Sequence, residues 1–128
     1  MSKDFFVVDP TGLNLPSDKT RLMPFINEQI GDGYADPVGF GTEKINKMIE
    51  WAGQKYGASL DDETPWNTWP PILMANGRYL TFNLSIYADS MTFMMILSDE
   101  CQKLGLIMID PSGREPFITL PNGGGLLG

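Results

Sequence analysis

The pair Asn76-Gly77, set between two apolar segments, is the feature that most restricts the folds open to this chain. Ile72 to Ala75 precedes the pair, and Arg78 to Ile86 follows it with side chains that alternate between apolar and polar. An Asn-Gly pair between two such arms is typical of a tight β-hairpin. The hairpin joins antiparallel strands, so the sheet of this chain is expected to be antiparallel or mixed.

Further helix and strand patterns lie on both sides of the hairpin. Apolar residues at helical spacing, each set preceded by a residue that can cap a helix, predict helices over residues 17–30, 42–56 and 89–104. Pro24 falls inside the first of these and is expected to kink that helix or delay its start. Short apolar segments predict three more strands, over Phe5–Val8, Leu106–Asp110 and Phe117–Leu120.

This mixture of elements predicts an α+β fold. We expect a two-layer sandwich, in which one mixed or antiparallel sheet has about three helices on one face. The chain has 128 residues, which suits one domain. We place a single α+β domain at residues 1–120 and a Gly-rich C-terminal tail at residues 121–128.

The composition removes many kinds of chemistry. The chain contains no histidine and a single cysteine, which argues against Ser-His-Asp and Cys-His catalysis, zinc fingers and disulfides. Cys101 lies on the apolar stripe of a predicted helix, which is typical of a core residue. The glycines form no phosphate-binding loop. We therefore expect a protein that is not an enzyme and holds no cofactor or metal.

The charge balance restricts the partners. Nine Lys and Arg residues stand against 16 Asp and Glu residues, so the net charge is −7. Nucleic acids and anionic membranes are poor partners for such a chain, whereas a basic protein is compatible with it. The same acidity is equally typical of a protein that is simply kept in solution by its charge.

The connection over residues 58–71 contains the densest acidic cluster and two tryptophans. Acids beside aromatic anchors are typical of a protein interface, so the first candidate contact surface consists of Asp61, Asp62, Glu63, Trp66 and Trp69. Two other interpretations stay open. The loop could be solvated, with its tryptophans folded onto the edge of the core. Clustered carboxylates could also bind calcium, although their spacing does not match an EF-hand.

The polar face of the alternating strand provides a second candidate surface. Its members share one face of a predicted strand and combine tyrosines with small hydrogen-bonding groups: Tyr79, Thr81, Asn83 and Tyr87. A sheet covered on one face would present these side chains to a partner or to water.

The order of elements resembles a known group of proteins. The chain opens with the strand Lys3 to Pro10 and closes with a helix, a glycine and a strand over Cys101 to Pro111. This layout resembles the small bacterial immunity-type proteins of polymorphic toxin systems, which include contact-dependent inhibition and type VI secretion. The resemblance implies a small acidic protein of the cytoplasm that occludes a cognate toxin.

Several functions remain open at this point. The first is an immunity protein that binds and neutralises one cognate toxin, which the acidic charge suggests is basic. The alternatives are a small-molecule-binding or regulatory domain and a structural subunit of a larger assembly. The first would use a pocket between the sheet and the predicted helix over residues 89–104, which contains Met91, Met94 and Met95. No segment has the length or pattern of a membrane span or an export signal, so we expect a cytoplasmic location.

Overall fold

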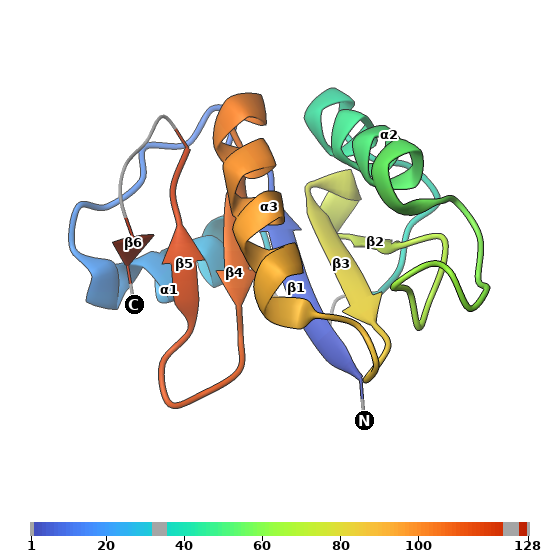
Figure 1. The fold of residues 1–128 in the computed structure, drawn as a ribbon. Coiled ribbons are helices and arrows are strands. Elements are labelled where there is room, and N and C mark those ends of the chain that lie inside the picture. The colour runs from blue at the N-terminus through green and yellow to red at the C-terminus, as the bar shows by residue number, and fades with distance from the viewer. Residues whose placement is uncertain (1, 32–35, 122–125, 128) are drawn as a thin grey trace.

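An antiparallel sheet forms the centre of the molecule in a computed structural model, which describes residues 2–31, 36–121 and 126–127. Within these residues the sheet has six strands in the order β2-β3-β1-β4-β5-β6 (Figure 1). Every neighbouring pair is antiparallel. The strands are β1 (Lys3–Val8), β2 (Ile72–Met74), β3 (Tyr79–Leu84), β4 (Ile107–Asp110), β5 (Phe117–Thr119) and β6 (Leu126–Leu127). The expected α+β class is confirmed, and the sheet is antiparallel.

The three predicted helices are present, as α1 (Lys19–Gln29), α2 (Glu43–Tyr56) and α3 (Ser90–Leu104). Each helix begins after a capping residue whose side chain accepts a hydrogen bond from a backbone N–H of the first turn. The capping residues are Asp18, Thr42 and Asp89, respectively. These bonds satisfy N–H groups that have no partner inside the helix. Pro24 lies inside α1, but the helix begins at Lys19, directly after its cap Asp18, so Pro24 does not delay its start.

The helices cover both faces of the sheet (Figure 1). α2 and α3 pack on one face, where Phe5 and Phe82 belong to the larger core cluster. α1 packs on the other face, where its Leu22 and Ile26 contact a smaller cluster that includes Tyr79. The placement of all three helices on one face was therefore wrong. β1 and β4 carry apolar residues on both faces, so neither face can be left to water.

The Asn-Gly hairpin is confirmed, with a longer turn than a two-residue loop. Met74 of β2 pairs with Tyr79 of β3, and residues 75–78 connect them. Three successive residues of this turn have positive φ, with values of 52° at Ala75, 57° at Asn76 and 80° at Gly77. The turn therefore depends on residues that tolerate the left-handed region.

Part of the Gly-rich tail joins the sheet. Leu126 and Leu127 form β6 and pair with Thr119 and Ile118 of β5. β5 therefore has a neighbouring strand on both sides, β4 and β6. Residues 122–125 and 128 of the predicted tail lie outside the described residues.

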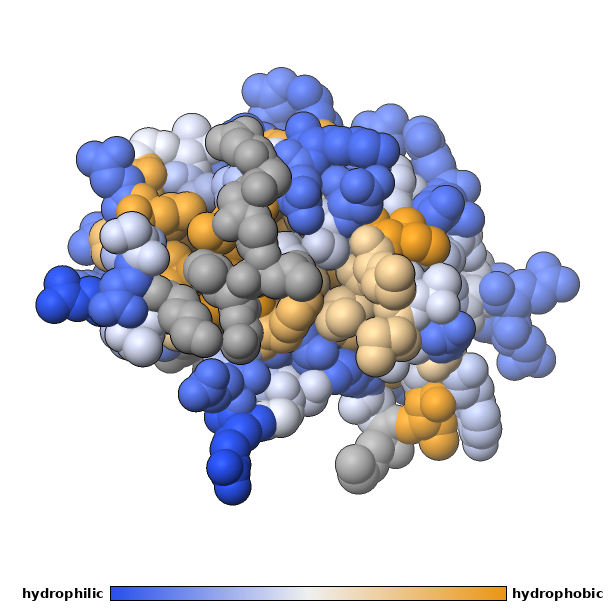
Figure 2. All heavy atoms as spheres, turned by 60° about the vertical axis from the view of Figure 1, so that its left-hand side comes forward, coloured by the Kyte–Doolittle hydropathy of each residue, from blue (hydrophilic) through white to orange (hydrophobic). Residues whose placement is uncertain are grey.

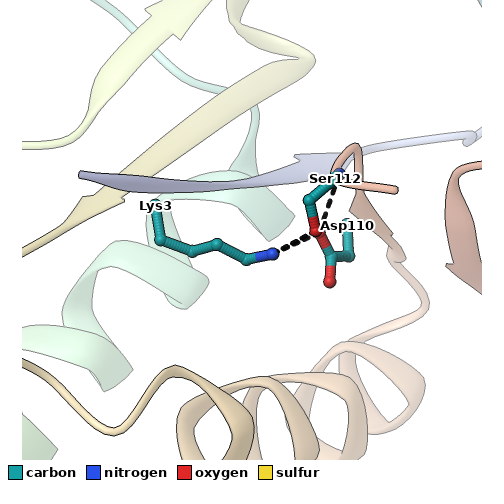
Figure 3. A network of polar contacts seen from close by, with 3 residues as sticks. All are labelled: Lys3, Asp110 and Ser112. Atoms are coloured by element: carbon teal, nitrogen blue, oxygen red, sulfur yellow. Dashed lines mark hydrogen bonds and ion pairs between the residues drawn. The ribbon is translucent and has the colours of Figure 1, made fainter. Parts of the chain in front are cut away.

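A polar cluster joins β1 to the end of β4 (Figure 3). Lys3 Nζ lies 2.9 Å from Asp110 Oδ1 and also donates to the hydroxyl of Ser112. The backbone N–H and the hydroxyl of Ser112 donate to the same carboxylate oxygen at 3.0 and 2.7 Å. Burial alone would raise the pKa of Asp110, but the hydrogen bonds from Lys3 and Ser112 outweigh it and hold that pKa below its ordinary value. The cluster therefore favours the ionised carboxylate.

We expect the Lys3–Asp110 contact to stabilise the fold only while Asp110 is ionised. A carboxylate whose pKa is lower in the folded state stabilises that state above its unfolded pKa of about 3.9, and the contribution is lost as pH falls through the folded pKa. Urea unfolding should show wild type more stable than Asp110→Asn at pH 6. The difference should shrink below about pH 4. A difference that stays constant down to pH 2.5 would contradict this assignment.

Candidate functional site

A groove of about 770 Å³ lies between the loop that follows α2 and the segment that joins β3 to α3. Residues 60–67 form one wall, and the other wall contains Tyr87, Asp89, Thr92 and Ile96. Both walls lie at the end of the sheet where β1 begins and β3 ends (Figure 1). The groove thus joins two segments that are far apart in the sequence.

Asp61 organises the acidic wall. Its carboxylate accepts hydrogen bonds from the N–H groups of Glu63 and Thr64 at 2.8 and 3.1 Å, and from the Ser59 hydroxyl at 2.8 Å. The Thr64 hydroxyl closes the turn by donating to the Ser59 carbonyl oxygen at 2.8 Å. The Ser59 hydrogen bond is the main cause of the lowered pKa of Asp61. Asp61 therefore shapes the loop, and its carboxylate is already engaged.

The far end of this loop is held by backbone contacts to β3. Ser85 N–H donates to the Pro65 carbonyl oxygen at 2.8 Å, and Asn67 N–H donates to the Asn83 carbonyl oxygen at 2.9 Å. The Asn83 side chain accepts from Asn67 and Thr68 and donates to Ser2 and Asp4. Asn83, predicted as a contact residue, therefore positions the loop against β1.

Aromatic rings form the base of the groove. Trp66 is only 4 % exposed, and its indole N–H donates to the Gly57 carbonyl oxygen at 2.7 Å. Its ring stacks on Phe82 and meets Tyr56 and Phe93 edge to face. Trp66 is therefore a core residue, and its predicted role as an exposed anchor was wrong. The open interpretation in which the tryptophans fold onto the core edge is correct for Trp66.

Trp69 is half-buried and outside the lining of the groove. Its ring centroid lies 4.8 Å from that of Trp66, and its edge packs near Gly53 of α2. Trp69 thus packs against Trp66 without lining the groove itself. Trp69 therefore belongs to the aromatic cluster beneath the groove.

Asp89 occupies the opposite wall as the N-cap of α3. Its two carboxylate oxygens accept from the Thr92 backbone N–H at 3.1 Å and the Thr92 hydroxyl at 2.7 Å. The Thr92 hydroxyl is the first cause of the lowered pKa of Asp89. The sequence predicts Asp89 as a helix cap, but only the tertiary fold places it opposite the acidic loop.

Asp62 and Glu63 differ from the two engaged acids. Both are exposed and line the groove. Neither carboxylate has a hydrogen-bond or ion-pair partner among residues 2–31, 36–121 and 126–127. The carboxylates of Asp62 and Glu63 are therefore free to bind a cation. Asp61 and Asp89 are engaged in local hydrogen bonds and add only to the negative potential of the groove.

The second predicted surface is not an open sheet face. Tyr79 and Thr81 are 1 % and 7 % exposed, because they lie on the face that α1 covers. The expectation that these two residues meet a partner was wrong. Tyr87, which follows the strand, is 92 % exposed and lines the groove. The structure thus brings Tyr87 together with Asp61, Asp62 and Glu63.

Exposed apolar side chains gather near the groove. Leu60 on the acidic wall is 56 % exposed, and Met91 and Met95 of α3 are 64 % and 65 % exposed. Figure 2 shows hydrophobic side chains over the outer side of α3. The structure places Met91 and Met95 at the surface.

Several other properties bear on what the chain binds. Cys101 is buried, as predicted for a core residue, and burial raises the pKa of its thiol. The part of the chain that the structure describes contains no group of three or more His, Cys, Asp or Glu placed to hold a metal ion. Within that part, no helix combines the length and apolar character needed to cross a membrane.

The chain matches no protein-family model, and neither curated proteins nor solved structures show a significant similarity to it.

Proposed function

We propose that this chain is a non-enzymatic immunity-type protein that binds a basic toxin domain and neutralises it. The observation that carries the proposal is the groove, in which Asp62 and Glu63 stand unpaired above an aromatic base. A lysine or arginine side chain that enters such a groove meets carboxylates at the rim and apolar rings below. A net charge of −7 adds a long-range attraction to a basic partner.

The groove also suits the task of occlusion. Hydrogen bonds in the Asp61 turn and in the cap of α3 hold its walls in place, so binding costs little conformational entropy in these walls. A partner loop that places a basic side chain between the walls would be covered on both sides. A nanomolar complex needs about 12 kcal/mol, which standard-sized interfaces with a few central anchors reach.

The proposal is tested by capture followed by rescue of growth. Tagged protein is used to capture partners from a lysate of the source organism, and a captured protein is identified by mass spectrometry. We expect that expression of this basic protein arrests growth and that co-expression of the chain restores it. A captured protein that does not impair growth would contradict neutralisation.

The site is tested by the double substitution Asp62→Lys and Glu63→Lys. Each lysine would repel a basic partner, so we expect a loss of affinity on the order of 100-fold, measured by calorimetry. Glu28→Lys with Glu50→Lys is the matched control, because both are exposed helix residues outside the groove and the change in net charge is the same. Equal losses in both variants would show that overall charge, and not the groove, drives binding.

A further inference from the structure

An apolar shoulder continues the groove along α3. We define this shoulder as Ile86, Tyr87, Met91 and Met95, which are 57 %, 92 %, 64 % and 65 % exposed. Tyr87 itself lines the groove, as do Thr92 and Ile96, the residues that follow Met91 and Met95 in α3. Neighbouring residues of a helix lie about 100° apart around its axis, so the shoulder and the groove share a border.

The chemistry of the two surfaces differs in a way that defines what covers them. The groove presents the free carboxylates of Asp62 and Glu63, and the shoulder presents apolar side chains, of which Met91 and Met95 lie one turn of α3 apart. Met91 and Met95 are flexible and polarisable, which suits them to pack against the apolar face of another helix. A segment that covers both surfaces at once carries cations on one side and apolar residues on the other.

We propose that the groove and shoulder together bind an amphipathic basic helix of the partner protein. The inference rests on the proposed function, because it specifies the segment that enters the same groove. The cations of the helix meet Asp62 and Glu63, and its apolar stripe covers Tyr87, Met91 and Met95. A second copy of this chain fits less well, because a net charge of −7 on each copy opposes association at an acidic rim.

The proposal is tested with two synthetic peptides of identical Leu and Lys composition and about four helical turns in length. One has the residues ordered to form an amphipathic helix, and the other has them scrambled. We expect the ordered peptide to bind the wild-type chain at least about 10-fold more tightly in fluorescence anisotropy, because burial of apolar surface adds to the shared charge attraction.

Substitutions locate this preference. Met91→Ser with Met95→Ser should abolish the preference while circular dichroism shows an intact fold, since both side chains are exposed. Phe40→Ser is the matched control, because Phe40 is also 58 % exposed but lies beside the hairpin turn and outside the groove lining. The control should keep the preference.

The outcomes separate the two proposals. Equal affinity for both peptides, or a preference that survives Met91→Ser with Met95→Ser, overturns the helix proposal and leaves the acidic groove standing. Binding of neither peptide overturns the helix proposal, and neutralisation is then decided by capture and growth rescue alone. A concentration-dependent dimer in light scattering that Met91→Ser with Met95→Ser abolishes assigns the shoulder to a second copy and also overturns the helix proposal.

Discussion

Replacing Trp66 by alanine is expected to lower the free energy of unfolding by about 3–5 kcal/mol, in the range for buried large aromatic residues. The side chain is 4 % exposed and packs against Tyr56, Phe82 and Phe93. Its removal leaves a cavity beneath the groove and frees the Gly57 carbonyl oxygen, which accepts the indole N–H at 2.7 Å. Urea unfolding followed by circular dichroism measures the loss.

Trp66→Phe separates packing from the hydrogen bond. Phenylalanine keeps a ring in the cluster but cannot donate to Gly57, so we expect a smaller loss of about 1–2 kcal/mol. If Trp66→Ala unfolds at the same urea concentration as wild type, Trp66 is not part of the core and its role as an exposed anchor is restored. Binding should therefore be compared only between variants that remain folded.

Replacing Gly77 by alanine is expected to cost about 3 kcal/mol or more. Gly77 has φ of 80°, which costs a residue with a side chain about 1–2 kcal/mol. A Cβ there would also lie 2.6 Å from the Phe40 carbonyl oxygen and 2.8 Å from the Gly41 Cα. Both are backbone atoms, so the hairpin turn would have to move away from the start of α2, at a cost of about 1–3 kcal/mol.

Gly12→Ala is the matched control for this effect. Gly12 has a similar φ of 86°, but a Cβ built there meets nothing within 4 Å. We therefore expect only the conformational cost of about 1–2 kcal/mol at Gly12. Equal thermal shifts for the two variants would mean that the close approach between Gly77 and residues 40–41 contributes nothing to stability.

Local chemistry explains which elements were predictable. The hairpin at Asn76-Gly77 needs residues that adopt positive φ, and α2 and α3 begin at side chains that bond to the first turn. Gly105 ends α3 in the left-handed conformation, as a glycine after a helix commonly does. These signals act between residues a few positions apart, so they can be read without knowledge of the fold.

The candidate site was predicted only in part. Asp61, Asp62, Glu63 and Tyr87 do line one groove, but the roles of the acids differ because Asp61 is engaged by its own turn. Tyr79 and Thr81 were misplaced because strand alternation was taken to mean a one-sided sheet. The unbroken apolar segments of β1 and β4 indicated instead that both faces of the sheet are covered, since a strand that is apolar on both faces must be buried on both.

The α+β class, the hairpin and the caps follow from the order of the amino acids alone, because each depends on backbone preference and hydrogen bonds within a few residues. Which aromatic side chains are buried, as Trp66 is, and which stand at the surface, as Tyr87 does, follows only from the assembled fold. Burial depends on what covers a residue, and α1 and α3 cover residues that are distant in the chain. The groove exists for the same reason, because its two walls meet only when the sheet is assembled.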